Sequence, residues 1–440
     1  MLHRWHAKSA ARLALAALAL AASQTLHAAG FALIEQGVSG MGTAYAGAAA
    51  TADSVDTLFF NPAGMTRLPG TQGGAAVHLV LPQNKFEDEG TTFVTGQPIP
   101  GGDGGDASSL AAVPHVYLTS QINDRTWLGL AINVPFGLTT EYDDDWVGRY
   151  HAIKSEVKTL NVNPSLAFKA SDRVSLAVGV SAMYLNGEFS NAMDFGLIGG
   201  SLPGSADGRL EIEGDSWGFG FNLGALFELS EDTRIGIHYR SEVEQNIEGH
   251  ADFTIPSTAN PGLGYVFTDT KVGADVDLPA TASVSAFHQV NGEWAIMGDY
   301  TWTGWSSIPE LRFDFANSLP DGVTTFNWDD TNRLSLGATF KPASAGWTYR
   351  FGVAYDESPI PDAASRSARL PDNDRVWLAI GAGFEPSKNL KIDIGYAHLF
   401  IDDPEIAKTG LEPEDVTRGA LNGSYDSSVD ILSIEARYVF

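Results

Sequence analysis

The sequence predicts an all-β transmembrane barrel of about 14 antiparallel strands, with an N-terminal hatch, or plug, inside its lumen. Apolar and polar residues alternate with period two over most of the chain, several alternating segments reach ten or more residues, and no long apolar run follows the N-terminus. A transmembrane helix needs about 20 consecutive apolar residues, whereas a tilted transmembrane strand needs about 9–11. The chain of 440 residues is therefore expected to cross a membrane with strands.

Composition excludes several classes of function. The chain has no cysteine, which removes disulfide scaffolds, thiolate zinc sites and cysteine nucleophiles. Lys and Arg number 27 against 54 Asp and Glu, so the net charge of -27 repels phosphate backbones and makes nucleic acid an unsuitable partner. The ten histidines show no zinc-binding spacing. We expect neither a metal nor a cofactor.

Residues 1–28 have the three-part pattern of a secretory signal peptide. Arg4, Lys8 and Arg12 are followed by an apolar run over 13–22 and then by a short segment that ends at Ala28. We therefore expect export and removal of this leader.

Residues 29–70 do not alternate, and we predict that they form the hatch. Glycines crowd the first part of this segment, and Phe31, Phe59, Phe60 and Met65 make it partly apolar. An exposed periplasmic tail would not need these side chains. A plug explains them, because a barrel of fourteen strands would otherwise leave a hole open to water.

Residues 71–440 are expected to form the barrel. Alternating segments are centred near residues 77, 116, 131, 164, 180, 222, 238, 280, 299, 335, 350, 379, 394 and 434. Short turns alternate with long acidic or Gly/Pro-rich loops, as expected of periplasmic turns and extracellular loops. A soluble β-sandwich would also alternate, but its strands are usually about 5–6 residues long. An even number of strands suits a closed barrel with no unpaired edge in lipid.

Several motifs occur in the order found in a known family. They are 40–47 (GMGTAYAG), Asn61-Pro62-Ala63, 217–220 (WGFG), 239–242 (YRSE) and 370–375 (LPDNDR). Together they resemble the FadL-type outer-membrane long-chain fatty acid transporters, over nearly the whole mature chain. The resemblance implies a monomeric, non-enzymatic barrel in the bacterial outer membrane that takes up hydrophobic molecules. The terminal Phe440 also suits recognition by the barrel assembly machinery, and outer-membrane lipids and lipopolysaccharide would surround the barrel.

The third strand is interrupted by a proline. Alternation over 127–132 meets Val134, Pro135, Phe136 and Gly137, and a proline removes one ladder donor in hydrocarbon. The plain alternative is a strand that ends and enters a loop. The resemblance instead implies an inward kink that opens a lateral exit through the wall.

The resemblance also implies a hatch that acts as a gate. Ligand binding would shift Phe31 and its neighbours, and Asn61, Pro62 and Ala63 are the further gate residues that we expect. The substrate would then diffuse passively from an apolar binding path into the membrane.

The identity of the substrate stays open in the sequence. Where fatty-acid transporters place basic lumenal residues, this chain has Asn191 and Asp329, and neither pairs with a carboxylate. Arg240, Asp356 and Arg375 are the candidate lumenal polar contacts. Aromatic or alkane hydrocarbons are therefore the alternative substrates to long-chain fatty acids.

Three weaker interpretations remain. Gly214-Asp215-Ser216-Trp217-Gly218 matches the nucleophile elbow of hydrolases, but a strand rather than a helix is expected to follow it. The acidic cluster at 141–145 could bind calcium or bridge lipopolysaccharide, although a solvated loop explains it as well. A diffusion porin for polar solutes is a third class, which the hatch argues against.

Overall fold

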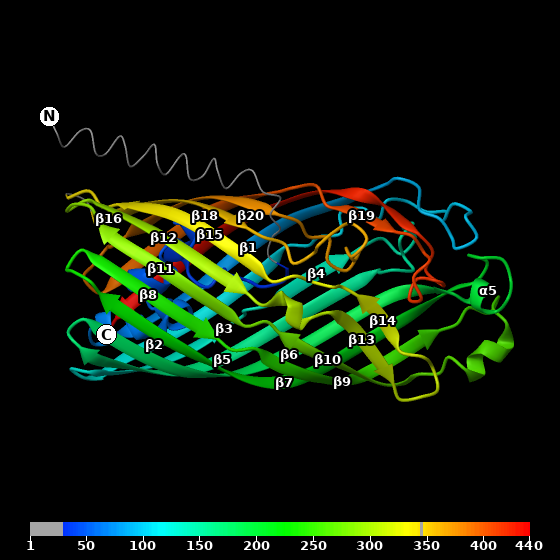
Figure 1. The fold of residues 1–440 in the computed structure, drawn as a ribbon, viewed down its shortest axis with the longest axis horizontal. Helices are drawn as coiled ribbons and strands as arrows, with labels where there is room; N and C mark the ends of the chain where they lie inside the picture. The colour runs from blue at the N-terminus through cyan, green and yellow to red at the C-terminus, as the bar shows by residue number, and fades with distance from the viewer. Residues whose placement is uncertain (1–29, 344–345) are drawn as a thin grey trace.

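The computed structural model describes residues 30–343 and 346–440, which form one long β-barrel (Figure 1). The expected signal peptide, residues 1–28, lies outside the described residues. The wall is a closed barrel of 14 antiparallel strands, as predicted. Ladder pairs from Gln72↔Val439 to Asp88↔Gly423 join the first strand to the last, so the sheet closes on itself.

Most wall strands are continuous. They are β1 (Thr71–Asp88), β2 (Ala111–Asn123), β5 (Lys154–Ser171), β6 (Val174–Asp194), β7 (Asp207–Glu228), β15 (Thr331–Phe340), β16 (Trp347–Asp356), β17 (Arg375–Phe384) and β20 (Leu421–Val439).

The other wall strands consist of two segments each. They are β3 (Thr126–Asn133) with β4 (Gly137–Glu141), β8 (Thr233–Arg240) with β9 (Val243–Thr254), β10 (Thr270–Leu278) with β11 (Thr281–Gln289), β12 (Trp294–Thr303) with β13 (Glu310–Phe315), and β18 (Leu390–Ile401) with β19 (Glu405–Lys408). A short strand, β14 (Gly322–Thr325), pairs with β13 above the wall.

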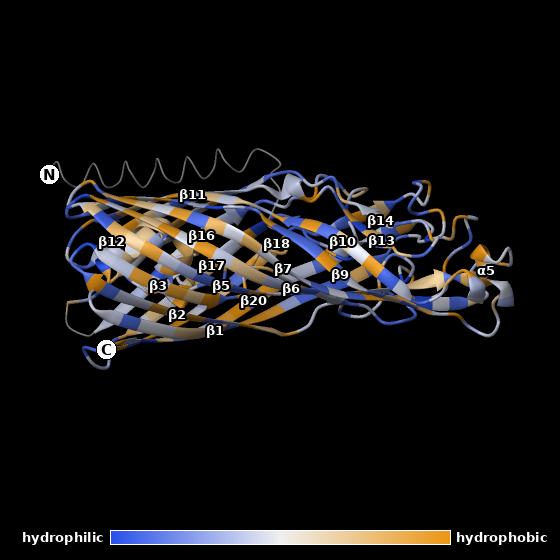
Figure 2. Ribbon diagram, turned by 90° about the horizontal axis from the view of Figure 1, so that it is seen from below, coloured by the Kyte–Doolittle hydropathy of each residue, from blue (hydrophilic) through white to orange (hydrophobic). Residues whose placement is uncertain are grey.

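The predicted alternation separates an apolar outer face from a mixed inner face, and Figure 2 shows apolar and polar segments alternating along the strands. On β6, for example, Leu176, Val178 and Val180 are exposed, whereas Ser175 and Ser181 are buried. The exposed apolar side chains form the surface that lipid covers in a transmembrane barrel. The short turns lie at the same end as the C-terminus, and the long loops lie at the other end (Figure 1).

The hatch fills the lumen near the short-turn end. It contains α2 (Val38–Met41), α3 (Ala48–Thr51), α4 (Thr57–Phe60) and the 3-10 helix η1 (Pro62–Arg67). The remaining helices, α5 (Phe195–Ile198), η2 (Pro261–Tyr265) and η3 (Trp305–Ser307), belong to the loop end or the upper wall. Helix α2 contacts β17 and β18, α3 contacts β8 and β11, and η1 contacts β5, β6 and β7, so the hatch touches the wall on several sides.

Glycines on the inner wall allow the hatch backbone to come this close. A Cβ atom on Gly236 would lie 1.9 Å from the Ala49 carbonyl oxygen, and one on Gly352 would lie 2.0 Å from the Thr43 carbonyl carbon. Real Cβ atoms do not approach backbone atoms at these distances. Positions 236 and 352 of the wall therefore need glycine, because a larger residue would overlap the hatch backbone.

We predict that Gly352→Val destabilises the plugged barrel by about 1–3 kcal/mol, because the new side chain overlaps the hatch backbone. The measurement is the temperature at which the folded barrel loses its faster electrophoretic mobility. Gly298→Val on β12 is the control, since a Cβ there meets nothing nearer than 3.4 Å. Equal transition temperatures for the two variants would contradict the prediction.

Candidate functional site

The wall is interrupted where the third strand was predicted to kink. β3 ends at Asn133 and β4 begins at Gly137, so residues 134–136 leave the strand. On the neighbouring strand, the last pair that β2 makes with β3 is Val116↔Ile132. Among the described residues, the stretch 111–115 of β2 is laddered only to β1. The wall therefore has an open seam between β2 and the kink.

The start of the hatch occupies the kinked segment as a short piece of sheet. Ala32 forms an antiparallel bridge with Phe136. The Leu33 N–H donates to the Pro135 carbonyl over 2.8 Å, and the Gly137 N–H donates to the Phe31 carbonyl over 3.0 Å. The structure thus brings the predicted gate residue Phe31 together with the predicted kink.

A hatch glutamine completes this contact and has no counterpart in the sequence predictions. The Gln36 Nε2 donates to the Val134 carbonyl over 2.7 Å, and its Oε1 accepts from Asn133 Nδ2 over 2.8 Å. Asn133 in turn accepts from Asn161 Nδ2 over 2.9 Å. Buried amides therefore replace the ladder bonds that the kink removes.

The Phe31 side chain points away from the seam into an apolar chamber. Its ring centroid lies 5.1 Å from that of Trp305, 5.8 Å from Phe136 and 6.2 Å from Trp328. The other chamber walls are almost entirely apolar and include Leu138, Val157, Leu185, Phe189, Ile212, Ile247, Val276, Leu278, Ile308, Leu311, Phe313, Phe326 and Leu370.

The chamber is small in this structure. Its cavity volume is about 80 Å³, whereas an apolar protein cavity that binds benzene has about 150 Å³. A long hydrocarbon chain cannot fit unless side chains move. Phe31 is the chamber residue whose backbone also bonds the kinked segment, so its displacement would affect both the chamber and the kink.

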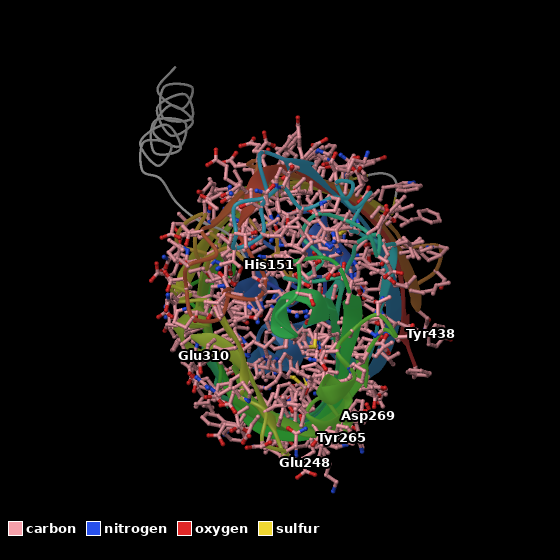
Figure 3. All side chains as sticks on the ribbon, turned by 90° about the vertical axis from the view of Figure 1, so that its right-hand side faces the viewer. His151, Glu248, Tyr265, Asp269, Glu310 and Tyr438 are labelled. Atoms are coloured by element: carbon pink, nitrogen blue, oxygen red, sulfur yellow. The ribbon has the colours of Figure 1, made fainter. Side chains whose placement is uncertain are left out.

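A larger cavity of about 940 Å³ lies on the loop side of the chamber, and we call it the vestibule. Its lining combines apolar side chains, among them Phe253, with charged ones of both signs, among them Lys408, Arg418, Glu412 and Glu414. The vestibule and the chamber share the lining residues Ile212, Phe313 and Arg369. Figure 3 looks into this end of the barrel, with the loops folded across its mouth.

Arg369 is the charged residue at that junction, and the sequence did not single it out. Among the described residues, its guanidinium donates only to uncharged acceptors: Ser155 Oγ at 3.1 Å, Asn191 Oδ1 at 3.2 Å and the Lys154 carbonyl at 3.4 Å. Its Nε is buried without a hydrogen-bond partner. Burial lowers the pKa of Arg369 to about 9, and the charge of Arg418 adds to this effect.

This guanidinium stays largely protonated at neutral pH, because a pKa of about 9 lies above 7. A buried charge without a counter-charge is unfavourable. An anionic group at the mouth of the chamber would supply the missing partner. The sequence carries one weak indication of this site, because Asn191 stands where a basic residue was expected. In the structure, the Asn191 side chain accepts a hydrogen bond from Arg369.

The three candidate lumenal polar residues lie elsewhere, near the hatch. Arg240 donates to Ser181 Oγ and to the Phe59 carbonyl, each over 3.2 Å, and covers the Phe59 ring at 4.6 Å. Asp356 accepts from Trp377 Nε1 over 3.2 Å. None of the three lines the chamber or the vestibule.

Arg375 supports the start of the hatch through an aspartate. It forms an ion pair with Asp372, and Asp372 Oδ2 accepts from the Gly30 N–H over 2.9 Å. Arg240, Asp356 and Arg375 are thus placed to stabilise the plug rather than to contact a ligand in the chamber.

Other wall arginines hold the body of the hatch in the same way. Arg234 donates to the Ala50 and Thr51 carbonyls over 3.1 and 2.9 Å, Arg333 to Ala44 over 3.1 Å, and Arg437 to Asp53 over 2.8 Å. Short helices leave their last carbonyl groups without partners, and Arg234 satisfies two of those at the end of α3.

Asn61 anchors the hatch to the wall at the start of η1. Its Nδ2 donates to the Ala49 carbonyl over 2.7 Å and to the Ala225 carbonyl over 2.9 Å, and its Oδ1 accepts from the Ala63 N–H over 3.1 Å. Pro62 and Ala63 are buried beside it. These three predicted gate residues are therefore positioned as a fixed base, at a distance along the chain from the seam.

Two further motifs have ordinary structural partners. Ser216 lies within β7, where its Oγ donates to Gln245 Oε1 over 2.6 Å, so a strand follows the elbow-like sequence. In the acidic loop, Asp144 pairs with Arg209 at 2.6 Å.

A family model described as "Outer membrane protein transport protein (OMPP1/FadL/TodX)" matches residues 18–440. The chain belongs to this family. The long-chain fatty acid transport protein of Escherichia coli O6:H1 is 31% identical over 409 residues, which cover 87% of this chain and 89% of the relative. A Pseudomonas aeruginosa FadL homologue of known crystal structure is 27% identical, with a TM-score of 0.86 over 94% of this chain and 100% of that one.

A second group of similar structures supports the fold alone. The Ralstonia pickettii toluene transporter TbuX is 18% identical, with a TM-score of 0.66 over 92% of this chain and 100% of its own. Membership of the OMPP1/FadL/TodX family makes this protein an outer-membrane transporter of hydrophobic compounds. The resemblance seen in the sequence motifs is thereby confirmed.

We predict that Asn61→Ala lowers the stability of this family member by about 1–3 kcal/mol, because two buried carbonyl groups lose their donor. The readouts are the thermal transition of the barrel and the rate at which protease cuts the hatch. Asn246→Ala, at an exposed position of β9, is the control. If the Asn61→Ala protein is as stable and as protease-resistant as the Asn246→Ala protein, Asn61 is not an anchor.

Proposed function

We propose that this protein takes up long-chain fatty acids by passive diffusion. The fatty acid enters the vestibule and moves past Arg369 into the chamber. There it displaces Phe31, and it leaves the barrel laterally through the seam between β2 and the kink. Rearrangement is confined to the start of the hatch, because the hatch body is held by arginine side chains and by Asn61.

The magnitude of the hydrophobic effect favours a lateral path. Moving one methylene group out of water is favourable by about 0.8 kcal/mol, so the transfer free energy of a hydrocarbon chain with about fourteen methylene groups is on the order of 11 kcal/mol. Release into a water-filled pore would forfeit this favourable free energy. An apolar chamber that opens toward lipid keeps the chain buried throughout.

The observation that carries the proposal is the double position of residues 31–33. Their backbone pairs with residues 135–137 at the seam, while the Phe31 ring forms part of the chamber wall. A ligand that enlarges the chamber must move that ring, and this weakens the two backbone hydrogen bonds beside the seam. Occupation of the chamber and opening of the wall are therefore coupled.

Arg369 favours a fatty acid over a hydrocarbon as the substrate. A carboxylate would accept hydrogen bonds from a guanidinium that has only neutral partners, and charge-assisted bonds of this kind are among the strongest in proteins. Aromatic or alkane hydrocarbons are the second candidate class, since the chamber lining itself is apolar.

Two other functions have less support. A porin for polar solutes would need an open lumen, whereas the hatch fills this one. A hydrolase would need a base beside Ser216, whose described partner is Gln245. We therefore propose a transporter without enzymatic activity. We further propose that it acts as a monomer, meets lipopolysaccharide and outer-membrane lipid on its outer face, and is inserted by the barrel assembly machinery.

We predict that a disulfide between Ala32→Cys and Phe136→Cys lowers oleate uptake at least about fivefold, because it locks the hatch onto the kink. The two backbone hydrogen bonds flank this pair, which makes it the closer type of antiparallel pair and suits a disulfide. The measurement is labelled oleate uptake in cells that lack their own fatty acid transporter, before and after reduction.

The control joins Ala379→Cys to Ala397→Cys, a ladder pair between β17 and β18, neither of which borders the seam. The chain has no native cysteine that could interfere. Unchanged uptake with a fully formed Ala32–Phe136 crosslink would contradict lateral exit at the kink.

We predict that Arg369→Leu lowers oleate uptake about tenfold and leaves uptake of oleyl alcohol near the wild-type rate. Only the carboxylate needs the guanidinium, and losing one charged hydrogen-bond pair corresponds to about 1.5–3 kcal/mol. Arg312→Leu is the matched control, because that vestibule arginine already pairs with Glu310 at 2.7 Å and Asp321 at 2.8 Å. Equal losses for acid and alcohol would argue that Arg369 supports the fold only.

A further inference from the structure

The wall has a second interruption, on different strands from the kink. β10 is laddered to β9 over its whole length, but to β13 only through Val272↔Phe315 and Gly273↔Asp314. β12 ends at Thr303, and β13 turns away from the wall to pair with β14. Among the described residues, the edge 274–276 of β10 therefore has no ladder partner on this side.

Only a few bonds connect the two edges below this point. The Ser307 Oγ donates to the Asp277 carbonyl over 2.7 Å, and the Gly304 N–H donates to the Ala280 carbonyl over 2.9 Å. The opening is bounded below by these bonds and above by the Gly273↔Asp314 pair. We call the opening between residues 274–277 and 307–313 the side window.

A groove of about 600 Å³ lies on the outer surface of the side window. Its floor residues Ile247, Gly273, Ala274, Val276 and Ile308 also line the apolar chamber inside the barrel. The groove and the chamber are thus separated by one layer of small and aliphatic side chains. A Cβ atom at Gly273 would have a single neighbour, the Ile247 carbonyl oxygen at 3.8 Å, so this part of the layer is not tightly packed.

The side window opens just outside the apolar band of the barrel. Below it, β8 and β11 expose apolar side chains, with Ile237 44% and Val284 48% exposed. Beside it, the exposed side chains of β9 and β10 include Glu244, Glu248 and Asp277. Hydrophobic molecules that collect at the outer boundary of the membrane would meet the window there.

The rim of the groove carries negative charge. Its ionisable residues are Glu248, Asp275, Asp277, Glu310, Asp314 and Arg312. Arg312 is already paired with Glu310 and Asp321. Figure 3 labels Glu248 and Glu310 at the perimeter of the barrel and His151 inside it, in agreement with an outward-facing rim. Such a rim repels carboxylates and leaves uncharged molecules unaffected.

We propose that the side window is a second, lateral entrance to the chamber, used by uncharged hydrophobic molecules. This inference rests on the proposed function, because the side window leads into the same chamber and the same exit. The two entrances differ in charge: the vestibule offers Arg369 to an anion, whereas the side window excludes anions by its acidic rim. Fatty acids and hydrocarbons thereby reach one chamber by separate routes.

The test blocks the side window from outside without touching the chamber. Asp275→Cys places a single thiol on the rim, at an exposed residue that lines the groove and not the chamber. Coupling this thiol to a maleimide polyethylene glycol of several kilodaltons should lower naphthalene uptake about fivefold and leave oleate uptake unchanged. Asp252→Cys, an exposed β9 position outside the groove, is labelled in parallel as the control.

The outcomes separate this inference from the proposed function. Unchanged naphthalene uptake after complete labelling at position 275, equal losses for naphthalene and oleate, or no naphthalene uptake by the wild-type protein would each overturn the side entrance. Oleate uptake by the unlabelled protein tests the proposed function independently. Loss of naphthalene uptake at position 275 alone, with the position 252 conjugate active, would support the side entrance.

Discussion

The backbone hydrogen bond is the constraint on which this structure depends. In hydrocarbon an unpaired N–H or C=O group costs several kcal/mol, so a wall of strands must close on itself. The long register between β1 and β20 does this. In a wall built under that constraint, other groups bond the backbone beside each interruption. At the kink, residues 31–33 and Gln36 provide partners. At the lower end of the side window, Ser307 and Gly304 donate to the Asp277 and Ala280 carbonyls.

The same requirement explains the arginines inside the barrel. Short helices leave many carbonyl groups without partners, and the helices of the hatch have only four to six residues. Wall arginines donate to carbonyl groups of the hatch from several sides, and inner-wall glycines let the two backbones approach. The hatch therefore has a body bound to the wall and a leading segment bound mainly to the kink. This division is what permits a local rearrangement without loss of the plug.

Electrostatics inside the path differ from those outside it. The chamber is dry and apolar, which strengthens any charge interaction at its mouth. Arg369 lies at that mouth with neutral partners, while the acidic side chains that dominate the composition lie on loops and rims. A net charge of -27 would by itself disfavour an anionic substrate. Acidic and cationic side chains both line the vestibule, and Arg369 is the cation at the point where the vestibule meets the chamber.

The sequence by itself determined the barrel, its strand number and the presence of a plug. Period-two alternation and strand length follow directly from which face meets lipid, and proline at position 135 marks the break in the third strand because it lacks an N–H group.

The sequence did not determine which residues line the transport path. Arg240, Asp356 and Arg375 lie on lumen-facing positions, but periodicity gives the face of a residue and not its height in the barrel. Arg369 comes from a loop without periodicity, and only the folded loop brings it to Asn191 and the chamber. The side window likewise depends on where β13 leaves the wall, which is decided by its pairing with β14 rather than by any local residue pattern.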